Sequence, residues 1–175
     1  MKSEERRLVV LRHAKSAWPE GVADHDRPLA ARGRRDAPAA GRVLAGAGHL
    51  PDLVLCSTAL RARATWELAS AQWDAPPPVR HEGRLYGADA AGLLDVVRAV
   101  SDEIRALLVV GHNPGLEELV LLLAGGGSGD ALERIGVKFP TSALAVLEWR
   151  GADWGELGPG SALLTSVTVP RGARR

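Results

Sequence analysis

Short apolar runs of Leu and Val alternate with longer segments in which apolar residues recur at helical spacing. The apolar runs lie at residues 8–11, 53–56 and 107–110. Runs of this length are typical of strands that are buried on both faces of a parallel sheet. The helical periods lie at residues 29–47, 59–73 and 88–100. Strands and helices that alternate in this way predict βαβ units, and therefore a three-layer α/β/α sandwich around a mostly parallel central sheet.

The last third of the chain predicts one more helix and two further strands. Asn113 can cap a helix that has Pro114 at its first position. We expect that helix to end before the glycine-rich segment 125–129, which lacks the Gly-Lys-Ser/Thr ending of a nucleotide-binding loop and is typical of a flexible connector. Residues 142–149 and 162–169 are expected to form strands at the edge of the sheet, where antiparallel pairing can occur.

The length and composition favour one globular domain. We place a single domain at residues 1–175, with its core at about 6–170 and short flexible termini. Apolar residues make up 46% of the chain and charged residues 25%, which is the balance of a globular protein. Cys56 is the only cysteine, which excludes an internal disulfide and a cysteine-based metal cluster and favours a reducing compartment. We recognise no secretory or membrane-spanning pattern, and expect a cytoplasmic protein.

The charge of the chain is nearly balanced, with 22 basic and 21 acidic side chains and a net charge of +1. Such a balance does not favour binding to nucleic acid or to an anionic membrane. The basic set is nevertheless uneven, because only three of its members are lysines. An excess of arginine can reflect genomic base composition, but the planar guanidinium is also a bidentate ligand of phosphate. The positions of the arginines therefore carry more information than their number.

Two histidines and two arginines follow the predicted buried strands. Arg12 and His13 come directly after the first strand, Arg61 follows shortly after the second, and His112 follows the third. The carboxyl ends of parallel strands meet at one edge of a sheet, where ligands of α/β proteins bind. Guanidinium groups and helix N-termini at such an edge favour phosphate as the ligand. A lone His or Arg is usually structural, but this shared placement predicts a phosphate pocket.

The imidazoles give the predicted pocket a chemical function. A neutral imidazole can attack phosphorus and form a covalent phosphohistidine, which water then cleaves. The arginines would neutralise the charge that spreads over the equatorial oxygens of the transferred group. These residues therefore favour phosphoryl transfer over simple structural roles.

Four motifs stand in a fixed order along the chain. They are Leu-Arg-His-Ala-Lys-Ser at 11–16, Arg-Pro-Leu with a following Arg-Gly at 27–33, Cys-Ser-Thr-Ala-Leu-Arg-Ala-Arg-Ala-Thr at 56–65, and Val-Gly-His-Asn-Pro at 110–114. Together they resemble the motifs of the histidine phosphatase superfamily, which also contains the phosphoglycerate mutases. In so short a chain the combination is most similar to the SixA-type phosphohistidine phosphatases. Thr58 departs from the pattern, because the family usually has Pro there.

The resemblance implies a role for each residue of the predicted pocket. His13 matches the nucleophile that becomes phosphorylated, and Arg12 matches the arginine beside it. Arg61 matches the second phosphate-binding arginine, and His112 matches the second histidine, which holds a phosphoryl oxygen and supports the transition state. The resemblance also implies a phosphoglycerate mutase-like fold and catalysis without a metal ion or another cofactor.

The proton donor is the open part of this assignment. Glu82 is the candidate in the segment where larger relatives carry a glutamate, whereas Asp89 is better interpreted as a helix N-cap. A pocket without a positioned carboxylic acid would favour phosphorus–nitrogen substrates, because imidazole leaves readily from protonated phosphohistidine and an alkoxide does not. Only 50 residues separate Arg61 from His112, which leaves no room for a large lid.

The loop after the first motif has charged and aromatic residues close to the predicted pocket in sequence. His25 lies between Asp24 and Asp26, and a polar loop is favoured over a metal site because no second ligand cluster accompanies the three. Either aspartate could orient an arginine. Trp18 is a candidate for the pocket mouth.

The function that the sequence favours is hydrolysis of protein phosphohistidine through a covalent intermediate on His13. An alternative keeps the same pocket for small phosphate esters, with a phosphorylated metabolite in place of a phosphorylated protein. A further alternative, from another class, is a phosphate-binding or phosphoprotein-binding module without turnover. Neither nucleic acid nor a membrane is an expected partner.

Overall fold

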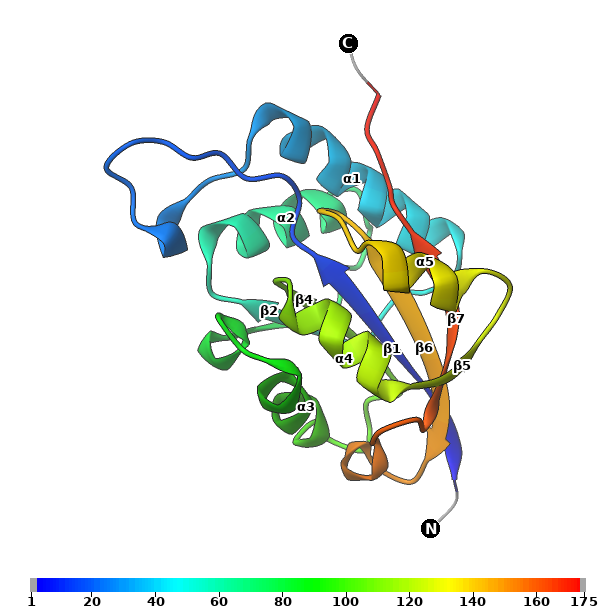
Figure 1. The fold of residues 1–175 in the computed structure, drawn as a ribbon. Helices are drawn as coiled ribbons and strands as arrows, with labels where there is room; N and C mark the ends of the chain where they lie inside the picture. The colour runs from blue at the N-terminus through cyan, green and yellow to red at the C-terminus, as the bar shows by residue number, and fades with distance from the viewer. Residues whose placement is uncertain (1–2, 174–175) are drawn as a thin grey trace.

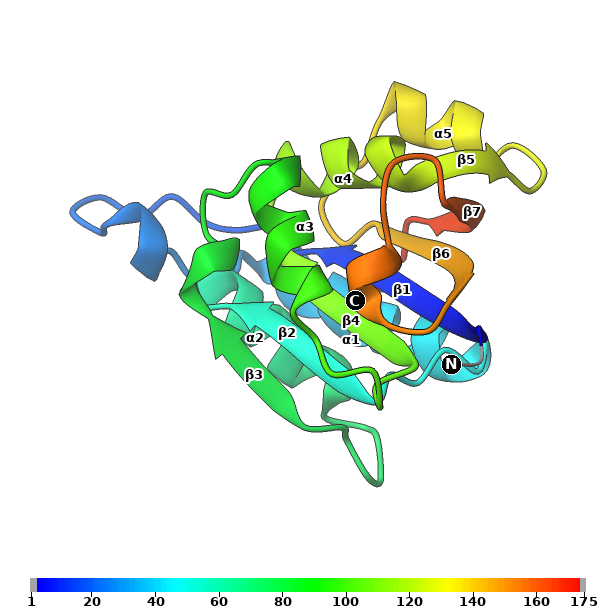
Figure 2. The same ribbon diagram turned by 90° about the horizontal axis from the view of Figure 1, so that it is seen from below.

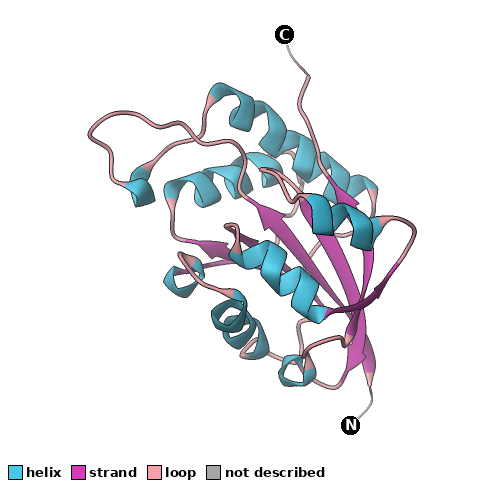
Figure 3. Ribbon diagram, in the orientation of Figure 1, coloured by secondary structure: helices cyan, strands magenta, loops and turns pink. Residues whose placement is uncertain are grey.

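The computed structural model describes residues 3–173, which build a seven-stranded sheet with helices on both faces (Figures 1 and 3). The strand order is β3-β2-β4-β1-β6-β7-β5. The strands are β1 (Glu4–Arg12), β2 (Leu53–Ser57), β3 (Val79–Glu82), β4 (Ala106–Gly111), β5 (Ala124–Gly127), β6 (Leu144–Gly151) and β7 (Ala162–Thr168). β6 runs antiparallel to both of its neighbours, and the other neighbouring pairs are parallel. The predicted fold class, mostly parallel α/β, is therefore confirmed.

Five α-helices form the two outer layers, as the two views in Figures 1 and 2 show. One layer has α1 (Ala31–Gly46) and α2 (Leu60–Ser70), and the other has α3 (Ala90–Arg98), α4 (Gly115–Leu123) and α5 (Ala131–Val137). Three short 3-10 helices complete the elements: η1 (Asp24–Asp26), η2 (Gly83–Leu85) and η3 (Trp154–Glu156). No helix within residues 3–173 is long and apolar enough to cross a membrane.

The central strand β1 shows why its apolar run is continuous. Leu8 and Val10 pack into the core under α3, α4 and α5, whereas Val9 and Leu11 pack into the core under α1 and α2. Successive side chains of a strand point to opposite faces, so a strand between two helical layers needs apolar residues at every position. All four side chains are almost completely buried.

The structure corrects the prediction for the edge of the sheet. β6 lies inside the sheet, between β1 and β7, and the edge strand on this side is β5. β5 occupies the glycine-rich segment that was predicted to be a flexible connector, and it pairs in parallel with β7. Gly125 is required there, because a Cβ would come within 2.1 Å of the carbonyl oxygen of Gly160. A strand of glycines has no apolar pattern, so the sequence did not reveal it.

The start of α4 differs from the prediction by one residue. α4 begins at Gly115, and Pro114 rather than Asn113 occupies the N-cap position. The side chain of Asn113 still connects the helix to the next segment: its Oδ1 accepts from the N–H of Glu117 at 3.2 Å, and its Nδ2 donates to the carbonyl of Phe139 at 2.8 Å. This arrangement holds the loop after β4 at the carboxyl end of the sheet.

The C-terminal segment is attached to α1. The N–H of Gly172 donates to Oδ1 of the buried Asp36 at 2.8 Å, and Arg171 lies 3.4 Å from the other oxygen. The tail that we expected to be flexible is therefore bonded to the fold at these two residues, and residues 174–175 lie outside the described part of the chain.

Candidate active site

Three of the four motifs, those at 11–16, 56–65 and 110–114, meet at the carboxyl ends of β1, β2 and β4. These three strands are neighbours in the sheet. Arg12 at the end of β1 is in register with Gly111 at the end of β4. His13 and His112, which follow these two strands, have ring centroids 5.2 Å apart. Ser57, at the end of β2, places its Oγ 2.7 Å from Nε2 of His112. The predicted convergence of the strand ends thus brings both histidines together.

His13 is held as a neutral imidazole with one defined tautomer. The side chain is buried, with 6% of the residue exposed, and its Nδ1–H donates to the carbonyl of Ala14 at 2.7 Å. Burial, supported by the charges of His112 and Arg61, lowers the pKa of His13 to about 3 against the opposing bond to Ala14. Because Nδ1 carries the proton, Nε2 keeps its lone pair. The Nε2 atom is therefore able to act as a nucleophile.

The second histidine is fixed by Ser57. The Ser57 hydroxyl accepts from the N–H of Ala59 at 3.2 Å, and it also forms a hydrogen bond with Nε2 of His112 in which either atom can donate. Burial, and then the charge of Arg61, lowers the pKa of His112 to about 4. The other ring nitrogen, Nδ1, is buried and has no hydrogen-bond partner among residues 3–173. His112 thus brings a second imidazole to the site without adding a fixed charge.

Arg61 is hydrogen-bonded to both the main chain and the side chain of Asp24. Its Nη1 donates to the Asp24 carbonyl at 2.7 Å, and its Nη2 donates to Oδ2 at 3.1 Å. Arg27 donates from Nε to Oδ1 at 3.0 Å, and the hydroxyl of Tyr86 donates to Oδ2. The bond from Tyr86, together with the two arginines, holds the pKa of Asp24 well below its usual range. We expected that either Asp24 or Asp26 could orient an arginine, and Asp24 is the one that does so.

The other residues of this loop have different roles. His25 places Nε2 2.9 Å from Oγ1 of Thr58, the residue at which this chain departs from the family pattern. Asp26 is mostly exposed and lies 3.8 Å from His25. Trp18 is 75% exposed and covers the guanidinium of Arg27, whose Cζ lies 3.4 Å from the ring centroid. The loop is thus joined to the site by the bonds of Asp24 to Arg61 and of His25 to Thr58, and Trp18 packs on Arg27.

Arg12 and the turn after β1 are supported by residues 139–142, which lead into β6. Arg12 donates from Nη1 to the carbonyl of Phe139 at 3.2 Å, and burial lowers its pKa, although its guanidinium remains charged. The N–H of Ser142 donates to the carbonyls of both Arg12 and His13, each at 3.1 Å. Ser142 adopts a positive φ of 67°, which is uncommon for a residue with a side chain. No sequence signal pointed to Ser142, because its role depends on its backbone.

Glu82 does not have the properties of a proton donor. Both of its carboxylate oxygens accept from Arg84: the backbone N–H at 3.1 Å, Nε at 3.0 Å and Nη2 at 3.0 Å. These bonds lower the pKa of Glu82 to about 2, so the group is an ionised acceptor at neutral pH. Asp89 caps α3 by accepting from the N–H of Gly92 at 2.9 Å, as predicted. The assignment of Glu82 as an acid is therefore not supported by its geometry.

Comparison with known proteins decides the family. Residues 8–90 match the family model described as the histidine phosphatase superfamily, branch 1. The uncharacterized protein Rv1276c of Mycobacterium tuberculosis is 48% identical over 163 residues, which cover 92% of this chain and 100% of that protein. The chain belongs to the histidine phosphatase superfamily.

Solved structures relate this histidine phosphatase to the SixA type. The candidate phosphohistidine phosphatase SixA from Nakamurella multipartitia is 34% identical, with a TM-score of 0.84 over 95% of this chain and 97% of that chain. The candidate SixA from Agrobacterium tumefaciens is 32% identical, with a TM-score of 0.72 over 82% of this chain and 92% of that chain. The similarity supports a phosphatase activity for this chain and the phosphoglycerate mutase-like fold.

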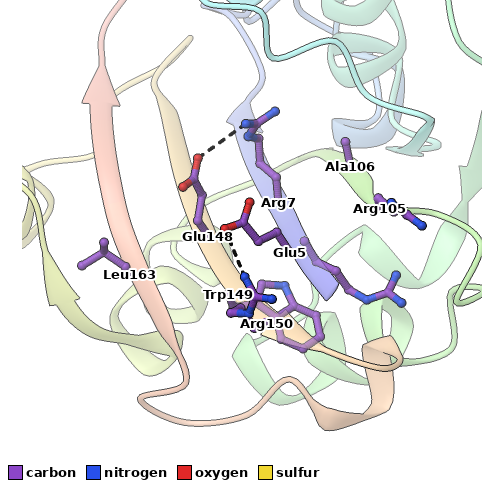
Figure 4. Close-up of a pocket in the computed structure, with 9 residues that line it drawn as sticks. Glu5, Arg7, Arg105, Ala106, Glu148, Trp149, Arg150 and Leu163 are labelled. Atoms are coloured by element: carbon purple, nitrogen blue, oxygen red, sulfur yellow. Dashed lines mark hydrogen bonds and ion pairs between the residues drawn. The ribbon is translucent and has the colours of Figure 1, made fainter. Parts of the chain in front are cut away.

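This histidine phosphatase has a cavity at the opposite end of the strands, shown in Figure 4. Its volume is about 330 Å³. Two ion pairs lie within its lining: Arg7 lies 3.5 Å from Glu148, and Arg150 lies 3.2 Å from Glu5. The cavity contains none of the histidines of the strand ends and is therefore separate from the candidate active site.

The low pKa of His13 predicts an imidazole that stays neutral in mild acid. An unperturbed histidine is half protonated near pH 6.5. We expect the ¹⁵N NMR spectrum of His13 to show the neutral, Nδ1-protonated ring from pH 7 down to about pH 4, since its pKa is lowered to about 3. A midpoint between pH 6 and 7 would contradict the assigned environment.

The same shift makes the stability of the fold depend on pH, with a defined sign. Between about pH 6.5 and pH 3 the unfolded chain binds a proton at residue 13 that the folded chain does not bind. The free energy of unfolding should therefore fall as the pH is lowered through this window, and the contribution of His13 to that fall is about 2 kcal/mol from pH 7 to pH 5. Urea unfolding of wild type and His13→Asn at pH 7 and pH 5 measures the difference.

Proposed function

We propose that this histidine phosphatase removes phosphate from phosphohistidine side chains of proteins through a covalent intermediate on His13. The observation that carries the proposal is the environment of His13. It is a buried, neutral imidazole whose Nδ1–H is bonded to Ala14, and its ring centroid lies 5.2 Å from that of His112. Arg12 and Arg61 are close enough for their charges to lower the pKa of His13. Such a group is suited to attack on a phosphoryl group held by the arginines.

In the first step, Nε2 of His13 attacks phosphorus. The Nε2–P bond forms as the bond between phosphorus and the substrate nitrogen breaks, and the electron pair of that bond moves to the leaving nitrogen. The substrate ring, protonated on its other nitrogen, departs as neutral imidazole. Arg12 and Arg61 are the charged donors available to the phosphoryl oxygens, and the ring of His112 lies beside His13. No proton has to be delivered to the leaving nitrogen in this step.

In the second step, water attacks the phosphorylated His13. The oxygen–phosphorus bond forms, the bond from phosphorus to Nε2 breaks with its electron pair returning to Nε2, and inorganic phosphate leaves with both protons of the water. The bond from Nδ1–H to Ala14 keeps the imidazole in the same orientation through both steps. The enzyme therefore returns to the state in which Nε2 carries a lone pair.

Two of the carboxylates near the site, those of Glu82 and Asp24, support a preference for phosphorus–nitrogen bonds. Glu82 is fully engaged by Arg84, and Asp24 accepts from Arg27, Arg61 and Tyr86. Both carboxylates have lowered pKa values and are poor proton donors at neutral pH. Alkyl phosphates need a proton on the leaving oxygen, and a positioned acid typically contributes about 10²- to 10⁴-fold to such reactions. The site is therefore better matched to phosphohistidine than to alkyl esters.

A substrate comparison tests this function. Purified protein in the presence of a metal chelator is given a phosphohistidine-containing carrier protein and, separately, phosphoserine and glycerol phosphate. We expect kcat/KM for phosphohistidine to exceed that for the alkyl esters by about 100-fold or more, with Glu82→Gln changing either value less than about threefold. Equal rates on alkyl esters, or a large loss in Glu82→Gln, would assign the pocket to small esters. Binding of phosphoprotein without release of phosphate would indicate a binding module.

A further inference from the structure

The rim of the active site carries a pair of aromatic rings that the steps above do not use. Tyr86 and His25 meet edge to face, with ring centroids 4.9 Å apart and an interplanar angle of 90°. Tyr86 also meets His112 edge to face, at 5.5 Å and 76°. The Tyr86 residue is 36% exposed, and it lies beside a histidine that belongs to the phosphate pocket.

The position of the Tyr86 ring is fixed from the phosphate side. Its hydroxyl donates to Asp24, the carboxylate that also holds Arg61 and Arg27. The Cζ atom of Arg61 lies 5.9 Å from the Tyr86 ring centroid. A group bound to a phosphoryl held by Arg61 and His112 therefore starts within a few ångströms of a preoriented aromatic surface.

We propose that Tyr86 is a specificity residue that favours substrates whose leaving group is an aromatic nitrogen ring, which packs against the exposed part of the tyrosine. The proposal rests on the proposed function and names the leaving-group class for the same site. Offset or edge-to-face aromatic pairs are favourable, and a protonated imidazole is further attracted to the face of an aromatic ring. Packing of this kind would also favour the protonated form of phosphohistidine, which is the form that leaves as neutral imidazole.

Two substrates and two variants separate this role from support of Asp24. Phosphoimidazole and phosphoramidate both contain a phosphorus–nitrogen bond, but only the first has an aromatic leaving group. We expect Tyr86→Leu to lower the ratio of kcat/KM for phosphoimidazole to kcat/KM for phosphoramidate by about three- to tenfold. Tyr86→Phe keeps the ring and removes the bond to Asp24, so it should lower both values together and leave their ratio within about twofold.

An unchanged ratio in Tyr86→Leu would overturn the proposal and would leave Tyr86 only as a partner of Asp24. Failure of the proposed function would give a different result, because in that case the wild type would cleave neither phosphorus–nitrogen compound. In that case the same ratio is measured with phenyl phosphate and methyl phosphate. A three- to tenfold fall of that ratio in Tyr86→Leu would still support selection of aromatic leaving groups, and no change would refute it.

Discussion

Replacement of His13 by asparagine is expected to abolish turnover, lowering kcat/KM by about 10⁴-fold or more. Asparagine is smaller than histidine but also polar, so its side chain can still form hydrogen bonds at this buried position. It removes the Nε2 lone pair, which has no substitute at that position. Steady-state assays with a phosphohistidine-containing protein and with an aryl phosphate measure the loss. Wild type quenched during turnover should carry acid-labile phosphate on His13, and the variant should carry none.

The matched control for this experiment is His81→Asn. His81 lies on β3 and is exposed, so the same chemical change is made outside the site. We expect kcat/KM of the control to remain within about twofold of wild type. More than a tenth of wild-type turnover in His13→Asn, or phosphate trapped on His112, would assign the nucleophile to another residue.

The second large effect is expected at Arg61. Lysine keeps the positive charge but cannot maintain both bonds to Asp24 and contacts to a phosphoryl group, because its ammonium is a single point of charge. We expect Arg61→Lys to lower kcat/KM by about 10²- to 10³-fold, the size of effect seen when one donor to transition-state charge is lost. Inorganic phosphate should also inhibit the variant more weakly than wild type.

Arg63→Lys is the control, because Arg63 stands on the same helix two residues away and bonds to the carbonyl of Thr58 from Nε at 2.9 Å. Its kcat/KM should change by less than about threefold. If Arg61→Lys had an equally small effect, Arg61 would be a structural residue that only holds the loop at Asp24. Thermal unfolding of both variants shows whether a loss of activity reflects a loss of the fold.

Local sequence pattern was sufficient for the elements that are buried on two faces. The apolar runs at 8–11, 53–56 and 107–110 lie within β1, β2 and β4, because each position on these strands packs against a helical layer. Trp66 and Trp73 stand at seven-residue spacing in the predicted helical segment 59–73, and their rings pack edge to face with centroids 5.2 Å apart. Trp66 is buried.

Elements without such a pattern were missed or misplaced. The edge strand β5 consists of one alanine and three glycines, and its pairing partner β7 begins 35 residues further along the chain. Short α5 was not predicted, since two buried residues, Ala131 and Ile135, do not establish a helical period. Backbone hydrogen bonds define these segments, and those bonds depend on which distant strand lies alongside.

The sequence by itself determined that Arg12, His13, Arg61 and His112 would lie at one edge of a parallel sheet. This outcome requires only that the strands are parallel and end at those residues, because parallel strands place their carboxyl ends together. The tertiary structure decided the orientation and the hydrogen-bond partners of each side chain. It bonded Nδ1 of His13 to Ala14, bound Arg61 to Asp24, and turned Glu82 toward Arg84. It also brought Tyr86 to Asp24 across 62 positions of the chain. Hydrogen-bond direction, burial and pKa depend on which atoms are neighbours in space, and residue spacing does not contain that information.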